Sequence, residues 1–278
     1  MALVHAVPDR LKDLKPDEVM ACLIAERVLD VVAEPWDVNG AQGVPDAKLI
    51  YPDGSTAAFE VTKLAADGVF ETASILSKDR HRWSVPGQWF WSIEVGRNAA
   101  DVRKLKDCYQ EIILACEAAE VDDPSHEFGW RPTAPANVRW LVQESSCTMR
   151  GHRGMPAANM KNPGVQVVPD MGGGWIDQHL TGFAVGIKEA FDGAPHIAGH
   201  FEKLGKANAD ERHLFIPLHD TAMPFPVTTV LMFEDTLPPE APPVPDHITH
   251  LWLLPNYGRR VLLWSRNRGW RNVYPYDD

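Results

Sequence analysis

The chain has 278 residues, enough to bury a full hydrophobic core in one large domain or two. Its apolar content of 45% and charged content of 23% are ordinary for a globular protein. The net charge of −11 argues against binding nucleic acid through overall charge, because phosphate affinity comes largely from Lys and Arg. A nucleic-acid enzyme with this sequence therefore needs a local basic groove, and the acidity suits a protein with a basic partner equally well.

The sequence contains no apolar run of about 18 residues, so we expect no membrane span and no membrane partner. The N-terminus carries charges where a signal peptide needs an apolar stretch, which favours a cytoplasmic location. No pair of cysteines has zinc-site spacing, and reduced thiols suit this chain better than disulfides. The four cysteines are Cys22, Cys108, Cys116 and Cys147.

The first part of the chain predicts an irregular lead-in followed by a helix. Residues 1–16 show no periodic pattern, and Pro16-Asp17-Glu18 then opens a helix that we expect to reach about Ala33. Glu26 lies in the middle of that helix. A short strand and a glycine-containing loop should follow and lead the chain to Pro45.

The stretch PDAKLIYPDGSTAAFEVTK, residues 45–63, predicts a β-hairpin. Two short apolar runs flank Pro52-Asp53-Gly54, where proline presets φ, Asp bonds its own backbone and Gly accepts a positive φ. Because side chains alternate along a strand, Asp46 and Lys48 should share one face of the first strand. Glu60 lies near the end of the second strand, and its carboxylate and that of Asp46 can converge on one hard divalent cation.

These residues resemble the PD-(D/E)XK nuclease superfamily, whose signature is Pro-Asp, a spacer, then an acid, any residue and Lys. Pro45-Asp46 matches the first half and Glu60 the acid, but Thr62 stands where the pattern has lysine. The lysine comes one place later, at Lys63, which a regular strand turns to the opposite face. Either a bulge brings Lys63 round, or Lys48 substitutes for it, or the site lacks its lysine.

The resemblance implies a restriction-endonuclease-like core and hydrolysis of phosphodiester bonds, in DNA by preference or in RNA. It implies a Mg²⁺ or Mn²⁺ cofactor held by Asp46 and Glu60, with Glu26 as a further ligand from the preceding helix. Lys63 or Lys48 would join these acids as the catalytic lysine. The alternative is a catalytically inactive module on the same fold that binds nucleic acid or a protein, and an oligomer or an activating partner stays open.

The residues after the hairpin predict more elements of an α/β fold. A helix over about 70–82 ends in cations that could contact phosphate, and a strand should follow over 88–95. The clearest helix spans 101–120, with an apolar face through Leu105, Cys108, Ile112 and Cys116. A strand is expected at 138–143, and this order of elements indicates a mixed sheet sandwiched by helices. The cations at the end of the first of these helices are Lys78, Arg80 and Arg82.

The second half is less regular. Residues 144–164 predict a flexible loop, in which Arg150 and Arg153 are candidates for contact with a polyanion. Helices are expected at about 175–191 and 194–206, and the second places His196 and His200 on one face. Because no Glu accompanies them in a HExxH pattern, structural histidines are favoured over a zinc site. Further strands are expected at 165–168, 212–218, 227–233, 248–254 and 260–265.

The predicted organisation has three parts. Residues 1–16 form the lead-in, 17–143 the nuclease-like α/β core, and 144–278 an extension of additional strands and helices packed on the same core. The composition changes little between the last two parts, so no linker is evident between them.

Overall fold

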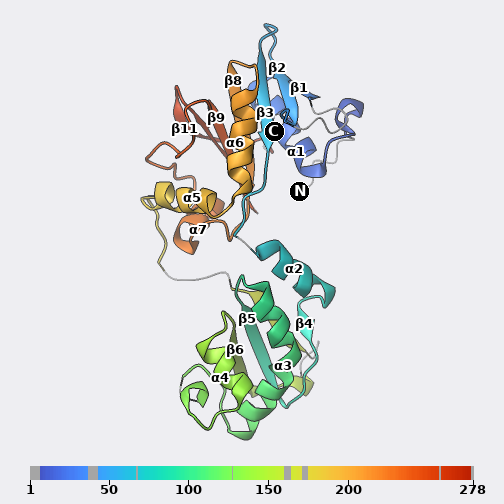
Figure 1. Ribbon diagram of the computed structural model, residues 1–278, viewed down its shortest axis with the longest axis vertical. Coiled ribbons are helices and arrows are strands. Elements are labelled where there is room, and N and C mark those ends of the chain that lie inside the picture. The colour runs from blue at the N-terminus through green and yellow to red at the C-terminus, as the bar shows by residue number, and fades with distance from the viewer. Residues whose placement is uncertain are drawn as a thin grey trace. The chain divides into compact units, whose positions relative to one another are not determined.

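The computed structural model describes residues 7–36, 43–66, 68–126, 128–159, 164–170, 175–256 and 258–276. The chain forms two compact units: unit 1 contains residues 1–66 and 172–278, and unit 2 contains residues 67–171 (Figure 1). The sequence predicts a boundary after residue 143, which lies inside unit 2. The reason is that strands from both ends of the chain complete one sheet, so unit 2 is an insertion within unit 1.

Unit 1 is built on a seven-stranded mixed sheet in the order β1-β2-β3-β8-β9-β10-β11. The first three strands are antiparallel, β3, β8 and β9 run parallel, and the last three are again antiparallel. The strands are β1 (Val32–Pro35), β2 (Ala47–Ile50), β3 (Thr56–Val61), β8 (Glu211–Leu218), β9 (His250–Pro255), β10 (Val261–Ser265) and β11 (Gly269–Val273).

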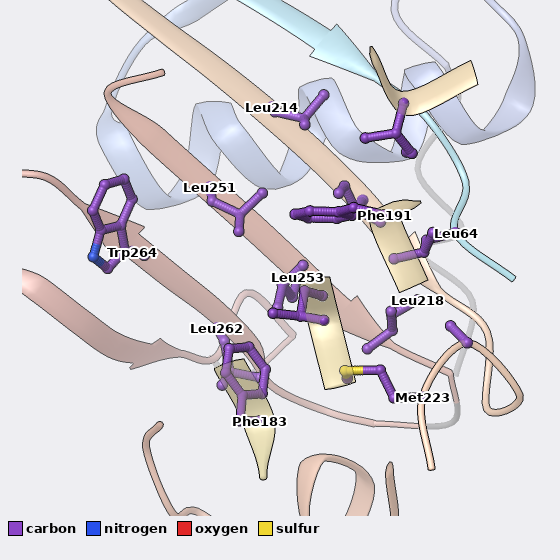
Figure 2. Close-up of a cluster of buried hydrophobic side chains, with 14 of the residues drawn as sticks. Leu64, Phe183, Phe191, Leu214, Leu218, Met223, Leu251, Leu253, Leu262 and Trp264 are labelled. Atoms are coloured by element: carbon purple, nitrogen blue, oxygen red, sulfur yellow. The ribbon is translucent and has the colours of Figure 1, made fainter. Parts of the chain in front are cut away.

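Helices cover both faces of this sheet, so the predicted α/β class with a mixed sheet sandwiched by helices is confirmed. α1 (Pro16–Leu29) packs its buried face on one side, against Phe59, Phe215 and Trp252. α5 (Phe183–Asp192), α6 (His196–Lys206) and α7 (Phe225–Phe233) cover the other side. Figure 2 shows the core beneath them, where Phe183 and Phe191 lie over the leucines of β8, β9 and β10.

Unit 2 is a four-stranded mixed sheet in the order β4-β7-β5-β6, with helices packed on one face. The predicted apolar face of the long helix is confirmed, since Leu105, Cys108, Ile112 and Cys116 are all buried. The strands are β4 (Arg82–Trp83), β5 (Trp89–Val95), β6 (Thr148–Pro156) and β7 (Val165–Pro169). The helices are α2 (Val69–Lys78), α3 (Ala99–Ala118) and α4 (Ala136–Gln143).

Two segments predicted as strands are helices. Residues 138–143 belong to α4, where Val138 and Leu141 are buried one helical turn apart against α3. Residues 227–233 belong to α7, whose first turn contains Pro226. Short apolar runs fit either structure, and a proline in the first turn favours the helix because its φ is preset.

Other boundaries also moved. The predicted helix over 175–191 begins only at Phe183, because Asp177 accepts a hydrogen bond from the Gly182 N–H at 2.8 Å and so holds a turn. The segment expected as a flexible loop at 144–164 contains the nine-residue strand β6. β11 was not predicted as a strand. Among the described residues, no helix is long and apolar enough to cross a membrane.

Candidate functional site

Asp46 and Glu60 lie opposite each other on the β2–β3 hairpin. The register pairs Ala47 with Phe59, so the next position places Asp46 across from Glu60. The Asp46 N–H donates to Glu60 Oε2 at 3.1 Å, and the Val61 N–H donates to Asp46 Oδ2 at 2.8 Å. The backbone N–H of Asp46 thus holds the Glu60 carboxylate, and the backbone N–H of Val61, the residue after Glu60, holds the Asp46 carboxylate.

A lysine that the sequence did not single out completes this pair. Lys203 belongs to α6, which packs on β3 and β8 (Figure 1). Its ammonium donates to both oxygens of Glu60, at 2.8 and 3.0 Å, and lies 3.5 Å from Asp46 Oδ1. One cation therefore contacts two carboxylates from neighbouring strands.

His200, one turn earlier on α6, is the second helix residue at the site. Its Nδ1 lies 2.5 Å from Glu60 Oε1, so Glu60 receives two α6 side chains as well as a backbone N–H. Glu60 is fully buried. A cavity of about 320 Å³ opens beside these side chains, and His196, His200, Lys203 and Lys206 are among the residues that line it.

Burial and mutual repulsion act on these charges. Burial, followed by the negative charge of Glu60, raises the pKa of the Asp46 carboxyl to about 6. Burial lowers the pKa of Lys203, but hydrogen bonding and attraction to Glu60 and then Asp46 outweigh it, and the net pKa is raised. Lys203 is therefore a firmly protonated cation at neutral pH.

A third carboxylate, Glu18, stands at the start of α1. Glu18 is buried and accepts hydrogen bonds from the Lys15 N–H at 2.9 Å and from Lys15 Nζ at 2.8 Å. The pKa of Asp46 is raised mainly by burial and by the charge of Glu60, and the charge of Glu18 raises it further. The helix before the hairpin therefore does supply an acid to this region, but it is Glu18. Glu26 instead accepts hydrogen bonds from Arg10 at 2.6 Å and from the Ala33 N–H at 2.7 Å.

The structure does not bring the two predicted lysines to the carboxylate pair. Lys63 Nζ lies 2.6 Å from Asp17 Oδ2 at the start of α1, on the face that strand alternation gave it. Lys48 Nζ lies 5.1 Å from the centre of the Trp36 ring, an interaction between a cation and an aromatic face. Both proposed substitutes are thus replaced by an ammonium that arrives from a helix.

The residues predicted to contact nucleic acid lie in the other unit. Lys78 ends α2, Arg80 follows it, and Arg82 begins β4, whereas Arg150 and Arg153 belong to β6. All five belong to unit 2, while Asp46, Glu60 and Lys203 belong to unit 1. Arg153 already lies 3.6 Å from Asp122 and over the Trp89 ring.

A second cluster in unit 1 has metal-ligating residue types. Ligand atoms of Glu211, His213 and His250 lie within 4.8 Å of one another. However, the Trp252 indole N–H donates to His213 Nδ1 at 3.2 Å, and an indole N–H can only donate. The proton of the neutral ring is therefore on Nε2, which donates to Glu211 Oε2 at 3.2 Å, and the Tyr51 hydroxyl donates to the same oxygen at 2.6 Å.

This chain of donors and acceptors is complete without a metal. Histidines that bind metals usually donate from their second nitrogen, whereas the second nitrogen of His213 accepts. Burial lowers the pKa of His213 and keeps its ring neutral. We therefore interpret this cluster as a hydrogen-bonded network that stabilises the sheet.

The sequence does contain a signal for the α6 residues, although the lack of a HExxH pattern argued against a site there. His196, His200 and Lys203 follow at intervals of four and three residues, so they form one polar row on a helix. The sequence does not show that His200 and Lys203 of this row contact Glu60, which lies 140 and 143 residues earlier in the chain.

Comparison of the chain with protein-family models, with curated proteins and with solved structures finds no match.

Proposed function

We propose that unit 1 hydrolyses phosphodiester bonds of nucleic acid, DNA by preference or RNA, with Mg²⁺ or Mn²⁺ held by Asp46 and Glu60. The observation that carries this proposal is the position of Lys203, whose ammonium lies 3.5 Å from Asp46 and 2.8 Å from Glu60. Two acids and one lysine are the residues that the resemblance to PD-(D/E)XK nucleases requires. In this proposal Lys203 of α6 takes the place of the lysine that the motif would have at Thr62.

The residues present fit a divalent cation of the hard type. Asp46 and Glu60 offer carboxylate oxygens, the ligands that Mg²⁺ prefers, and the charge of Glu18 reaches Asp46. Burial makes the charged form of Asp46 costly, so a cation between the acids is favoured. When bound, such an ion lowers the pKa of a coordinated water and neutralises charge on the phosphate.

The side chains divide the remaining work. Lys203 keeps its proton and offers N–H donors to the charge that develops on phosphate oxygens in the transition state. His200 holds Glu60 from the helix side and so orients its carboxylate. Lys203 and Lys206 of α6, together with Glu202, line the cavity through which a phosphate backbone would approach. We place this activity in the cytoplasm, which the four buried free thiols suit.

The test is cleavage of plasmid DNA, single-stranded DNA and RNA with Mg²⁺, Mn²⁺ or EDTA. We expect metal-dependent cleavage by the wild type, and a loss of at least 100-fold in Asp46→Asn, Glu60→Gln and Lys203→Arg. Lys203→Arg keeps the positive charge opposite Glu60 and so protects the fold. Lys63→Ala and Lys48→Ala are matched controls and should cleave like the wild type.

One observation favours the second candidate, a binding module without catalysis. Both oxygens of Glu60 already accept hydrogen bonds, from Lys203, His200 and the Asp46 N–H. If this closed arrangement were permanent, no metal would enter and the wild type would cleave none of the substrates. Nucleic-acid binding in EDTA without cleavage in Mg²⁺ or Mn²⁺ would establish that alternative.

A further inference from the structure

The helices α2, α3 and α4 of unit 2 pack on one face of its sheet. The buried side chains of β5, among them Trp91, Ile93 and Val95, point toward α2, α3 and α4 and form the core of the unit. Because side chains alternate along a strand, Ser92 and Glu94 point to the opposite face. Phe90, which is also buried, lies on this second face beside the His152 ring.

A row of polar side chains crosses this second face. Strand register pairs Arg82 of β4 with Gln166 of β7, Gln166 with Ser92 of β5, and Ser92 with Arg150 of β6. Each of the four strands thus contributes one residue, with an arginine at either end. Both arginines and Gln166 are exposed, and Ser92 is half-buried.

The neighbouring residues add a ring and one opposing charge. His152 is adjacent on β6, with Nε2 3.3 Å from Ser92 Oγ and its ring 5.3 Å from that of Phe90. Glu94 is on the same face, opposite Thr148, and Asp123 lies within electrostatic reach of Arg150. The two guanidinium groups therefore stand at the ends of the row, while the carboxylates lie beside it.

We propose that this row, Arg82-Gln166-Ser92-Arg150, binds the backbone of a single-stranded nucleic acid. Neighbouring strands lie ~4.8 Å apart, so the row spans about 14 Å, the length of a short single-stranded segment. Guanidinium groups bind phosphate through two hydrogen bonds, and the hydroxyl and amide between them can bind sugar or base edges. Unstacked bases can stack on the His152 ring and on the guanidinium planes. A duplex presents no unstacked bases, so this surface favours a single strand.

This inference does not depend on the chemistry of unit 1. Binding by the row needs no metal and no carboxylate pair, and it assigns a role to Arg82 and Arg150 that is separate from hydrolysis. The net charge of −11 does not oppose this binding, because the two arginines make a local positive contact.

The test is fluorescence anisotropy of labelled oligothymidine, oligouridine and a DNA duplex, with the full-length protein in EDTA over a series of salt concentrations. We expect the double variant Arg82→Ala/Arg150→Ala to bind the single strands at least tenfold more weakly than the wild type. The slope of log affinity against log salt should fall by about 1.4, or 0.7 for each lost phosphate contact. The matched control, Arg103→Ala/Lys106→Ala, removes two exposed cations of α3 on the helix-covered side and should bind like the wild type.

Three results would overturn the inference: no binding of single strands by the wild type, unchanged affinity in the double variant, or tighter binding of the duplex than of the single strands. Because EDTA removes any divalent cation, this binding measurement is separate from the proposed metal-dependent hydrolysis. Binding that depends on the arginines, in a protein that never cleaves, would support the row and reject the hydrolysis.

Discussion

The Lys203 ammonium on α6 lies 2.8 Å from Glu60 Oε1 on β3, although 143 residues separate the two in the chain. The same ammonium lies 3.5 Å from Asp46 Oδ1. The hairpin therefore supplies only the acids of the candidate site, and a helix packed on the sheet supplies its cation.

Removal of Lys203 should destabilise unit 1. Lys203→Ala leaves the fully buried carboxylate of Glu60 without its main counter-charge, which costs about 3–5 kcal/mol in the free energy of unfolding. Lys63→Ala breaks an exposed pair with Asp17 and should change that free energy by about 0.5 kcal/mol or less. Urea unfolding of both variants measures the difference, and equal stability would show that Lys203 does not compensate Glu60.

Removal of Lys203 should also release the acids for metal. A divalent cation and the ammonium compete for the same two carboxylates, so Lys203→Ala should bind Mn²⁺ at least as tightly as the wild type. The thermal stabilisation by Mn²⁺ should therefore be larger in Lys203→Ala than in the wild type and absent from Asp46→Asn/Glu60→Gln. A loss of Mn²⁺ binding in Lys203→Ala would contradict competition at this place.

The acids of this site were predictable from the sequence, and their cation was not. Asp46 and Glu60 are local in sequence: a turn signal and strand alternation suffice to place them opposite each other. Lys203 is paired with them only through the packing of α6 on β3, a long-range contact that no local pattern encodes. The sequence left Lys63 and Lys48 open as the catalytic lysine, and the structure pairs Lys63 with Asp17 instead. Glu18, in the first turn of α1, is the helix acid whose charge acts on Asp46.

The histidine network beside Tyr51 should make unit 1 sensitive to acid. Burial lowers the pKa of His250, and the hydrogen bond from His213 lowers that of Glu211. Both groups bind fewer protons in the folded state, so their contribution to stability is complete above pH about 6.5 and is lost as the pH falls. His250→Gln should flatten the decrease in the free energy of unfolding below pH 6.5, and a decrease as steep as in the wild type would exclude this source.

The two units should respond separately to core mutations. Ile112 is fully buried in unit 2, so Ile112→Ala should cost about 2–5 kcal/mol in that unit. Calorimetry should resolve two thermal transitions, of which Ile112→Ala lowers only one, while Phe183→Ala in the core of unit 1 lowers the other. A single transition that both variants shift equally would show that the units unfold together.

The elements that the sequence predicted poorly were missed for different physical reasons. The helix α7 is short and almost wholly apolar, so neither a period of two nor one of 3.6 residues stands out in it, whereas α4 is amphipathic but only eight residues long. β6 has the opposite difficulty, because its exposed half is rich in Gly, Arg and Met and its pairing with β5 comes from tertiary context. The long periodic helix α3 had neither problem and was predicted to within two residues.

Anomalous diffraction from crystals of the protein soaked in Mn²⁺ would locate the metal relative to Asp46, Glu60 and Lys203. We predict a manganese peak within about 2.5 Å of carboxylate oxygens of both Asp46 and Glu60, with the Lys203 ammonium displaced from Glu60 but still beside the ion. A peak among Glu211, His213 and His250 instead, or no peak while Lys203 stays on Glu60, would contradict the account.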